Sequence, residues 1–473
     1  MKDDRGNPGK IKLPAELAAR LENQLGIRGM EEFTACLGKR PAAGLRLNTA
    51  KGTLSQLQGL MPFPLEAIPW APAGFMFPED ERPGKLPYYQ AGLYYLQDPS
   101  AMAPAAALDA QPGERVLDLC AAPGGKTTQI AAAMAGDGLL VANDYNPRRI
   151  KALIWNLEHW GATNCVVLNE EPERLAAAAP GFFDKILVDA PCSGEGMLRK
   201  DPEAARNWRK YSGRLCRETQ DRLLDQAALM LAPGGRLVYS TCTFNPLENE
   251  GAVADFLERR PDFRLVPLPL FQGWQPGAAL KDCRQLWPHL GDGEGQFFAC
   301  MAKNTMQKGW DYPGSEGASA GRRPDRADGE AGGDSALDEE LRPFGEFMKD
   351  NFYRPLSGPF ALYNGHVYRF PPDLPNLAGL KVSRHGWYLG LIRNGRFTPS
   401  QHLAMGMKAE RMKRRLDLDP REETTERYLK GETLMIGGDK GWTLVTLAGY
   451  PLGFGKQTGN HLKNEYASGW RLT

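Results

Sequence analysis

The chain has 473 residues, with 58 Lys and Arg against 57 Asp and Glu, and eight cysteines. Because this length exceeds what one hydrophobic core usually organises, two or three domains are expected. No stretch approaches the roughly 18 uninterrupted apolar residues of a membrane-spanning helix, so no membrane contact is expected. There is neither a Cys-x-x-Cys pair nor an apolar leader, which predicts a reduced, cytoplasmic protein without a metal site.

The N-terminal part predicts a small mixed domain. Apolar residues recur at helical spacing through residues 13–37, and Pro14 suits the first turn of a helix. Residues 44–49 have the pattern of a strand, and the proline-rich stretch 62–87 predicts irregular connections. We expect residues 1–100 to form an α+β domain.

From Glu114 onward, apolar runs alternate with helical patterns and glycine-containing turns. The five apolar runs are 115–119, 138–143, 164–168, 185–189 and 236–240. Strands that alternate with helices predict right-handed crossovers and a mostly parallel sheet with helices on both faces. Residues 101–304 are therefore expected to form a Rossmann-like α/β domain.

The last third of the chain changes in composition twice. Residues 305–340 almost lack large apolar side chains, so they cannot bury enough surface to offset their ordering entropy and predict a flexible linker. Short apolar runs bounded by Gly, Pro and Asn then predict a β-rich module, divided into 341–397 and 398–473. Residues 381–473 hold 16 Lys and Arg against 9 Asp and Glu, a balance that can attract a polyanion.

The first strand of the α/β region leads into the loop Asp118-Leu-Cys-Ala-Ala-Pro-Gly-Gly-Lys-Thr-Thr128 and then into a helix. Such a loop lies at the carboxyl edge of a parallel sheet, where the helix N-terminus faces a ligand crevice. Its Gly-Lys-Thr ending is similar to a P-loop, but that motif needs glycine at the position of Cys120. A Gly-x-Gly-x-x-Gly dinucleotide loop is also missing here, so neither type of phosphate binding is favoured.

Three carboxylates follow predicted strands: Asp144, Asp189 and Glu171, with Glu170 as the alternative to Glu171. Each has a structural explanation; Asp144, for example, could cap a helix that begins near Pro147. Together they would converge on one crevice and favour a ligand with hydroxyl, amino and cationic groups. S-adenosylmethionine carries these groups and no phosphate, so it is the predicted cofactor.

Cys192 and Cys242 each follow a strand-like run. If these strands are neighbours in a parallel sheet, about 4.8 Å apart, both thiols emerge at the same edge. A free thiol with a pKa of about 8.5 is only a few per cent ionised at neutral pH, so a nucleophilic cysteine needs a nearby cation. Lys126 is the candidate cation. For Cys120 and Cys165 a buried structural role is favoured.

These strings resemble the NOL1/NOP2/Sun family of RNA cytosine-C5 methyltransferases. The matching segments are Asp118–Thr127, Asp189-Ala-Pro-Cys-Ser-Gly-Glu-Gly196, Tyr239-Ser-Thr-Cys-Thr243 and Asn249-Glu250, with Tyr95–Ser100 and Trp287–Phe297 extending the likeness. Met197–Pro202 and the long C-terminal extension are similar to the F subgroup of bacterial small-subunit ribosomal RNA methyltransferases. By this resemblance the chain has a class I S-adenosylmethionine-dependent methyltransferase domain and a PUA-like RNA-binding module.

The resemblance also implies roles for the residues of the site. Cys242 would attack carbon 6 of the target cytosine, and Cys192 would help proton removal and release of the enzyme. Asp189 would contact the cytosine edge or the cofactor, and Lys126 would support the site electrostatically. Relatives commonly have Asp where this chain offers Glu170 and Glu171, and Glu171 is preferred. The expected cofactor-binding residues are Ala121, Ala122, Pro123, Gly124, Gly125, Lys126, Thr127, Asp144, Glu171 and Asp189.

The implied partner is RNA, most specifically 16S rRNA or the small ribosomal subunit, recognised by residues 1–100 and 398–473. Transfer RNA as substrate and a non-catalytic RNA-binding assembly factor are the alternatives, and a monomer is expected. An enzyme that attacks carbon 6 needs an unstacked base, whose extrusion costs a few kcal/mol. Aromatic side chains could stack on bases, although core packing explains them equally well; the candidates are Tyr88, Tyr89, Tyr94 and Tyr95.

Overall fold

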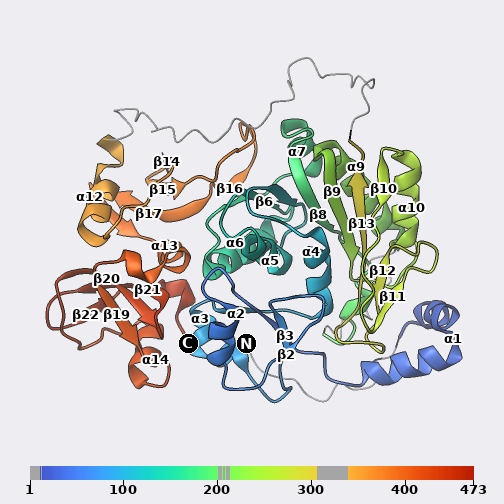
Figure 1. Ribbon diagram of the computed structural model, residues 1–473, viewed down its shortest axis with the longest axis horizontal. Helices are drawn as coiled ribbons and strands as arrows, with labels where there is room; N and C mark the ends of the chain where they lie inside the picture. The colour runs from blue at the N-terminus through green and yellow to red at the C-terminus, as the bar shows by residue number, and fades with distance from the viewer. Residues whose placement is uncertain are drawn as a thin grey trace.

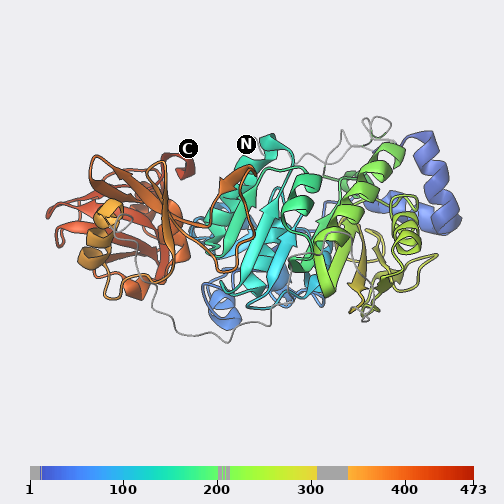
Figure 2. The same cartoon turned by 90° about the horizontal axis from the view of Figure 1, so that it is seen from above.

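The computed structural model describes residues 11, 13–200, 205, 208, 213–305 and 339–472, so nearly all of the expected linker lies outside it. A central α/β domain carries the C-terminal module on one side, and the long first helix lies at the far end (Figures 1 and 2). Among the helices of the described ranges, none is long and apolar enough to cross a membrane.

The N-terminal domain consists of a long helix and a small antiparallel sheet. Helix α1 (Ala15–Leu37) is kinked at Gly26, whose φ of 69° lies in the region that favours glycine. The sheet has the order β2 (Glu66–Ala67), β3 (Gly74–Met76), β1 (Gly44–Leu47) and β4 (Tyr94–Leu96). Short helices α2 (Leu54–Gly59) and α3 (Pro87–Gln90) connect its strands. The α+β character expected for this region is confirmed.

One ten-stranded sheet forms the centre of the molecule. Its order is β11 (Trp274–Pro276), β12 (Arg284–Leu286), β13 (Gln296–Lys303), β9 (Leu231–Thr241), β8 (Phe183–Asp189), β5 (Arg115–Asp118), β6 (Leu139–Asn143), β7 (Cys165–Leu168) and β16 (Val382–Arg384), with β10 (Phe263–Leu265) also paired to β13. Strands β5 to β9 run parallel to one another. The Rossmann-like domain expected from the alternating pattern is therefore confirmed.

Helices cover both faces of this sheet because successive side chains of a strand point to opposite faces. In β5, Val116 belongs to one core cluster and Leu117 to the other. The helices that pack in the Leu117 cluster are α7 (Pro172–Ala178), α9 (Gly213–Met230) and α10 (Glu250–Arg259), and those in the Val116 cluster are α4 (Ala103–Leu108), α5 (Gly125–Ala133) and α6 (Pro147–Trp160). The strand order reverses at β5, and open α/β sheets bind ligands outside the carboxyl ends at such a point.

The C-terminal module contains two four-stranded sheets. The first consists of β14 (Phe360–Tyr363), β15 (His366–Arg369), β17 (Trp387–Arg393) and β18 (Arg396–Pro399), and the second of β19 (Arg415–Leu418), β20 (Gly441–Leu447), β21 (Tyr450–Gln457) and β22 (Leu462–Asn464). Three helices accompany them: α12 (Arg342–Asn351), α13 (Gln401–Gly406) and α14 (Glu423–Leu429). The boundary expected at 397/398 lies inside β18. Phe344, Phe397, Leu444 and Phe454 share one core cluster, so the two sheets pack against each other.

Several contacts join the C-terminal module to the rest of the molecule, among them α13 packed on α6 and two contacts made by strands. Strand β16 adds to the free edge of β7 in antiparallel orientation, although its sequence lies beyond the linker. The second C-terminal sheet shares a core cluster with the N-terminal domain, where Leu47 and Tyr94 pack with Val445 and Tyr466. Removing the whole module would therefore expose both an edge of the central sheet and part of the N-terminal core.

Candidate active site

The loop after β5 lies at the point where the strand order reverses. Gly124 has a φ of 116°, which L side chains rarely adopt, and helix α5 begins at the next residue. The Thr127 hydroxyl donates to Asp118 Oδ2 at 2.8 Å, and Lys126 Nζ donates to Asp189 Oδ2 at 2.7 Å. Both side chains that a P-loop would turn toward phosphate are thus engaged by carboxylates, which argues further against nucleotide phosphates.

Asp118 is a deeply buried acid of this crevice, with 1% of its surface exposed. Burial raises its pKa to about 7, and the nearby Asp189 and Asp144 add to the shift, whereas the Thr127 hydrogen bond opposes it. Within the described ranges, its Oδ1 has no hydrogen-bond partner. A buried, partly protonated acid with an unused oxygen suits a ligand that brings an amino or cationic group. The donor set of this crevice is thus compatible with S-adenosylmethionine.

Asp144 follows β6 and is also buried. It accepts hydrogen bonds from the backbone N–H groups of Ala122, at 3.2 Å, and Asn146, at 2.9 Å. Arg149 forms an ion pair with it at 3.2 Å and donates to the Ala122 carbonyl. The cap of helix α6 is Asn146, not Asp144, because the Asn146 side chain accepts from the Arg148 N–H. The alternative interpretation of Asp144 as that cap is wrong.

The two glutamates after β7 are held very differently. Glu170 is buried, and its carboxylate accepts from the backbone N–H groups of Glu171 and Lys381, both at 3.0 Å, while pairing with Arg174 at 3.5 Å. Glu171 is exposed and precedes helix α7. The C-terminal module thus occupies Glu170 through Lys381, and Glu171 is the glutamate left available to a ligand.

Cys192 and Cys242 come together at the ends of two adjacent parallel strands, with their sulfur atoms 3.3 Å apart. The hydrogen bond from Cys192 lowers the pKa of Cys242, and the Lys126 charge lowers it further, against the effects of burial and Asp189. The same hydrogen bond raises the pKa of Cys192 well above its usual value, and burial adds to that shift. Of the two thiols, Cys242 is therefore the more readily ionised, and Cys192 is the one that more readily keeps its proton.

Asp189 connects the cofactor loop to the cysteine strands. In addition to Lys126, it accepts from Ser240 Oγ at 2.7 Å and from Gln296 Nε2 at 3.3 Å, both through Oδ1. Although burial lowers the pKa of Lys126, attraction to Asp189 outweighs it and the net shift is upward. Lys126 thus remains an ammonium ion close to Cys242.

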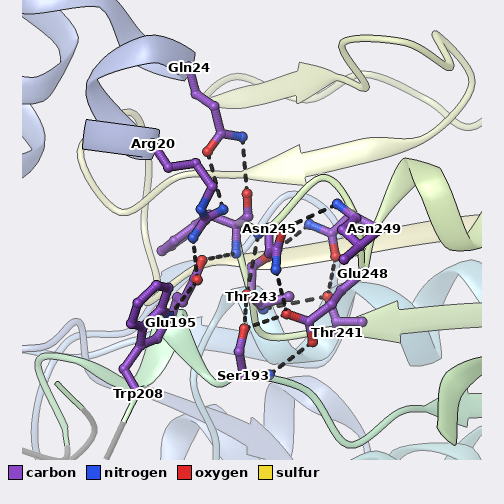
Figure 3. A network of polar contacts seen from close by, with 12 residues as sticks. Arg20, Gln24, Ser193, Glu195, Trp208, Thr241, Thr243, Asn245, Glu248 and Asn249 are labelled. Atoms are coloured by element: carbon purple, nitrogen blue, oxygen red, sulfur yellow. Dashed lines mark hydrogen bonds and ion pairs between the residues drawn. The ribbon is translucent and has the colours of Figure 1, made fainter. Parts of the chain in front are cut away.

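A second layer of polar residues, unforeseen at the sequence level, surrounds the two cysteine loops (Figure 3). Glu248 accepts from the backbone and hydroxyl of Ser193, while Glu195 accepts from the Phe244 N–H at 3.0 Å and pairs with Arg20 of α1. Glu195 lies inside a motif string already recognised, and Glu248 directly precedes another. Their position beside those strings was the only sequence signal available.

Arg46 was also missed, because the N-terminal strand that carries it shows no motif. This buried arginine donates to Thr128 Oγ1 at 2.6 Å and to the Gly125 carbonyl at 3.2 Å. Its guanidinium also lies 4.5 Å from the centre of the Trp160 ring. Burial lowers its pKa to about 9. Arg46 therefore supports the first turn of α5 from the neighbouring domain.

The four tyrosines considered for base stacking are packed in the interior or against it. Tyr94 is fully buried and donates to the Pro83 carbonyl at 2.6 Å, and Tyr88 and Tyr89 pack against the same core cluster. Tyr95 packs against the second core of the central sheet. Packing explains these side chains. Cys120 and Cys165 are buried as well, which agrees with a structural role.

The sequence matches four family models in chain order. These describe the N-terminal domain of 16S rRNA methyltransferase RsmF (residues 13–99), 16S rRNA methyltransferase RsmB/F (105–302), the first C-terminal domain of RsmF rRNA methyltransferase (346–407) and the methyltransferase RsmF PUA domain (415–472). The last match confirms the expected PUA-like module.

Whole proteins are similar over nearly the full length. Ribosomal RNA small subunit methyltransferase F of Shewanella amazonensis is 32% identical over 92% of this chain and 93% of its own. The protein of the same name from Shigella boydii serotype 4 is 32% identical over 92% and 91%. A solved methyltransferase homolog from Pyrococcus horikoshii is 29% identical with a TM-score of 0.51, covering 61% of this chain and 100% of that one.

The Rossmann-like sheet, the cofactor loop and the converging acids define an S-adenosylmethionine-dependent methyltransferase that acts on RNA. Within this class, the chain belongs to the ribosomal RNA small subunit methyltransferase F family.

Proposed function

We propose that this enzyme methylates carbon 5 of a cytosine in 16S rRNA through a covalent bond between Cys242 and carbon 6 of the base. The observation that supports this most is the pair of thiols 3.3 Å apart, with opposite pKa shifts, beside the Lys126–Asp189 ion pair. A transfer to an already nucleophilic atom would not need a thiolate. Carbon 5 of cytosine is a weak nucleophile, and addition of a thiolate at carbon 6 makes it electron-rich.

S-adenosylmethionine supplies the methyl group as an electrophile. We assign its binding to the loop from Ala121 to Thr127, with Asp144 and Glu171 for hydroxyl or amino groups. Asp118 offers its unpartnered Oδ1 from beneath the loop. Arg46 would hold the first turn of α5 in place through the Gly125 carbonyl. Asp189 lies between the cofactor loop and the cysteine strands, because it accepts hydrogen bonds from Lys126 in this loop and from Ser240 in β9.

Cys242 would attack carbon 6 as a thiolate and form a carbon–sulfur bond. The electron pair of the 5,6 double bond moves to carbon 5 and is delocalised onto N3, where a proton neutralises the developing charge. We assign Asp189 to the N3 edge of the cytosine. The Lys126 ammonium would supply positive charge beside it. The target base must leave its stack to meet the thiolate, at a cost of a few kcal/mol.

Cys192 would act when the enzyme leaves the product. After methyl transfer, water would take the proton on carbon 5, the electrons of that C–H bond would restore the double bond, and the bond between carbon 6 and sulfur would break to release Cys242 as a thiolate. The Cys192 thiol lies within hydrogen-bond distance of the Cys242 sulfur, so it would donate to the departing thiolate as charge returns. The thiol that lowers the pKa of the nucleophile thus also improves it as a leaving group.

The 16S rRNA assignment follows the names of the relatives and the matched PUA domain. The decisive experiment transfers labelled methyl groups to 16S rRNA and maps them by bisulfite sequencing. Cys242→Ala should lose on the order of 10⁴-fold or more in turnover, because the addition step is removed. Cys165→Ala, which changes a buried cysteine of β7, is the matched control and should retain turnover. Methylation by the Cys242 variant, or label on another atom, would overturn the proposal.

A further inference from the structure

Glu248 is a buried carboxylate between the two cysteine loops, and all its hydrogen bonds run to those loops and to α9 (Figure 3). Its Oε1 accepts from Ser193 Oγ at 2.6 Å and from Asn245 Nδ2 at 2.9 Å. Its Oε2 accepts from the Ser193 N–H at 3.0 Å and from Gln220 Nε2 at 3.1 Å. None of the ion pairs between described residues includes Glu248, and its carboxylate is held by these four donors together with the Cys216 thiol.

These contacts join segments that the sheet does not join. Ser193 directly follows Cys192, and its hydroxyl lies 2.7 Å from that of Thr243, which directly follows Cys242. Gln220 donates to the Pro191 carbonyl at 2.9 Å as well as to Glu248. Pairing of β8 with β9 ends at Asp189 and Ser240, before either cysteine. The relative position of the two sulfur atoms therefore depends on bonds beyond the ladder. Glu248 makes two of them to Ser193, alongside the Gly196 N–H, which donates to the Cys242 carbonyl at 2.7 Å.

The charge of Glu248 also reaches the two thiols unequally. It contributes to the raised pKa of Cys192, after the hydrogen bond with Cys242 and burial. It also contributes, after burial, to raising the pKa of Cys216 on α9 to about 11. The leading influences on Cys242 are instead Cys192, burial, Asp189 and Lys126. The carboxylate thus acts on the thiol side of the pair, and the ammonium acts on the thiolate side.

We propose that Glu248 is a positioning residue that clamps the Cys192 loop to the Cys242 loop and directs its negative charge at Cys192. The proposal deepens the proposed function and rests on it for the roles of the two thiols. A Cys192 thiol held in this way can donate a hydrogen bond to Cys242, and because it stays protonated it does not compete with Cys242 to attack the cytosine. Glu248 itself touches neither reacting sulfur in the hydrogen bonds of this site, so its effect passes through Ser193, Thr243 and Asn245.

The test measures the thiols without methylation. In full-length protein carrying Cys242→Ala, the alkylation rate of Cys192 is followed from pH 7 to 11 by mass spectrometry of its peptide, with Cys216 as a second reporter. Glu248→Gln should move the midpoint for Cys192 down by about one pH unit, because a neighbouring charge is removed. The control is Glu195→Gln, an equally buried carboxylate on the same loops that pairs with Arg20. It should leave the Cys192 midpoint in place.

Turnover in the native cysteine background gives the second readout. Glu248→Gln should lower kcat about 10- to 100-fold with little change in the KM for S-adenosylmethionine, and Glu248→Asp should restore the Cys192 midpoint but only part of kcat. If Glu248→Gln does not fold, Ser193→Ala breaks the clamp and keeps the charge; kcat should fall while the Cys192 midpoint stays unchanged. Equal midpoints in folded Glu248→Gln and Glu195→Gln, or undiminished kcat in Ser193→Ala, would overturn the proposal. Because alkylation needs no RNA, these results stand apart from a failure of the cytosine assignment.

Discussion

At the end of β8, Cys192 is buried near the Glu248 carboxylate, whereas at the end of β9, Cys242 lies near the Lys126 ammonium. The two strands are adjacent and parallel, and the two thiols are 3.3 Å apart. Nevertheless, the pKa of one is raised and that of the other is lowered. The hydrogen bond between the two thiols is the largest cause of this difference, and Lys126 at the start of α5 and Glu248 in the turn before α10 add to it.

The contrast shows how a symmetric-looking pair can perform two different steps. A nucleophile must be ionised before the reaction, and a group that assists departure must still hold its proton. If the two environments were identical, the thiols would share the proton equally. Neither cysteine would then be set up as the nucleophile or as the hydrogen-bond donor. The opposite charges on the two sides of the pair break that symmetry, and the first two predictions below each remove one contribution to it.

The largest effect is expected from Cys192→Ala, which deletes the thiol side of the pair. Turnover should fall on the order of 10²–10⁴-fold, because departure of Cys242 loses its donor. Attack remains possible, so a covalent protein–RNA adduct should accumulate on a denaturing gel. Cys300→Ala, which alters a buried cysteine of β13, serves as the control and should show no adduct. Loss of turnover without any adduct would contradict the division of roles.

Lys126→Met should have the next largest effect, on the thiolate side. Without the ammonium, the pKa of Cys242 rises and its alkylation at pH 7 should slow about tenfold. Turnover should fall about 100-fold, because Asp189 also loses its partner at 2.7 Å. Lys185→Met removes a comparably buried ammonium that pairs with Glu114 near the other end of β8. If both variants slowed Cys242 labelling equally, a specific role for Lys126 would be untenable.

Asp118→Asn should give the smallest loss of turnover and a clear change in pH dependence. The pKa of Asp118 in the folded protein, about 7, exceeds the ~4 of an unfolded chain, so the fold loses stability as pH rises from about 4 to 7. The substitution should remove that loss, on the order of 2–4 kcal/mol, and raise Tm relative to the unsubstituted protein at pH 8 but not at pH 4. Cofactor affinity should nevertheless fall at least tenfold.

Asp262→Asn provides a control of opposite sign for that measurement. The Arg260 hydrogen bond lowers the pKa of Asp262, so this carboxylate stabilises the fold above the unfolded pKa and ceases to do so as pH falls through the folded pKa. Its replacement should therefore lower Tm at pH 8, whereas Asp118→Asn should raise it. Parallel Tm–pH curves for the unsubstituted protein and Asp118→Asn would refute the buried-acid interpretation.

Much of the architecture was predictable because its signals are local. Apolar runs separated by helical patterns predicted the parallel strands, and both cysteines follow such runs. The parallel arrangement of β5 to β9 could be inferred from the sequence, but the pairing of β16 with β7 could not. Val382 lies more than 200 residues from Leu168, and its short run has no pattern that distinguishes one free edge from another. The consequence is specific: Lys381 engages Glu170, which leaves Glu171 exposed.

The sequence by itself determined the class of fold, the family and the residues that line the strand ends, because periodicity and motif strings are short-range properties. Only the tertiary structure decided how those residues act on one another. Coulombic interactions and hydrogen bonds depend on distances of a few ångströms between groups far apart in the chain. Lys126, Glu248 and the cysteine pair meet because helices α5 and α10 begin at the same edge of one sheet. That meeting, and not either cysteine motif alone, separates the thiolate from the thiol.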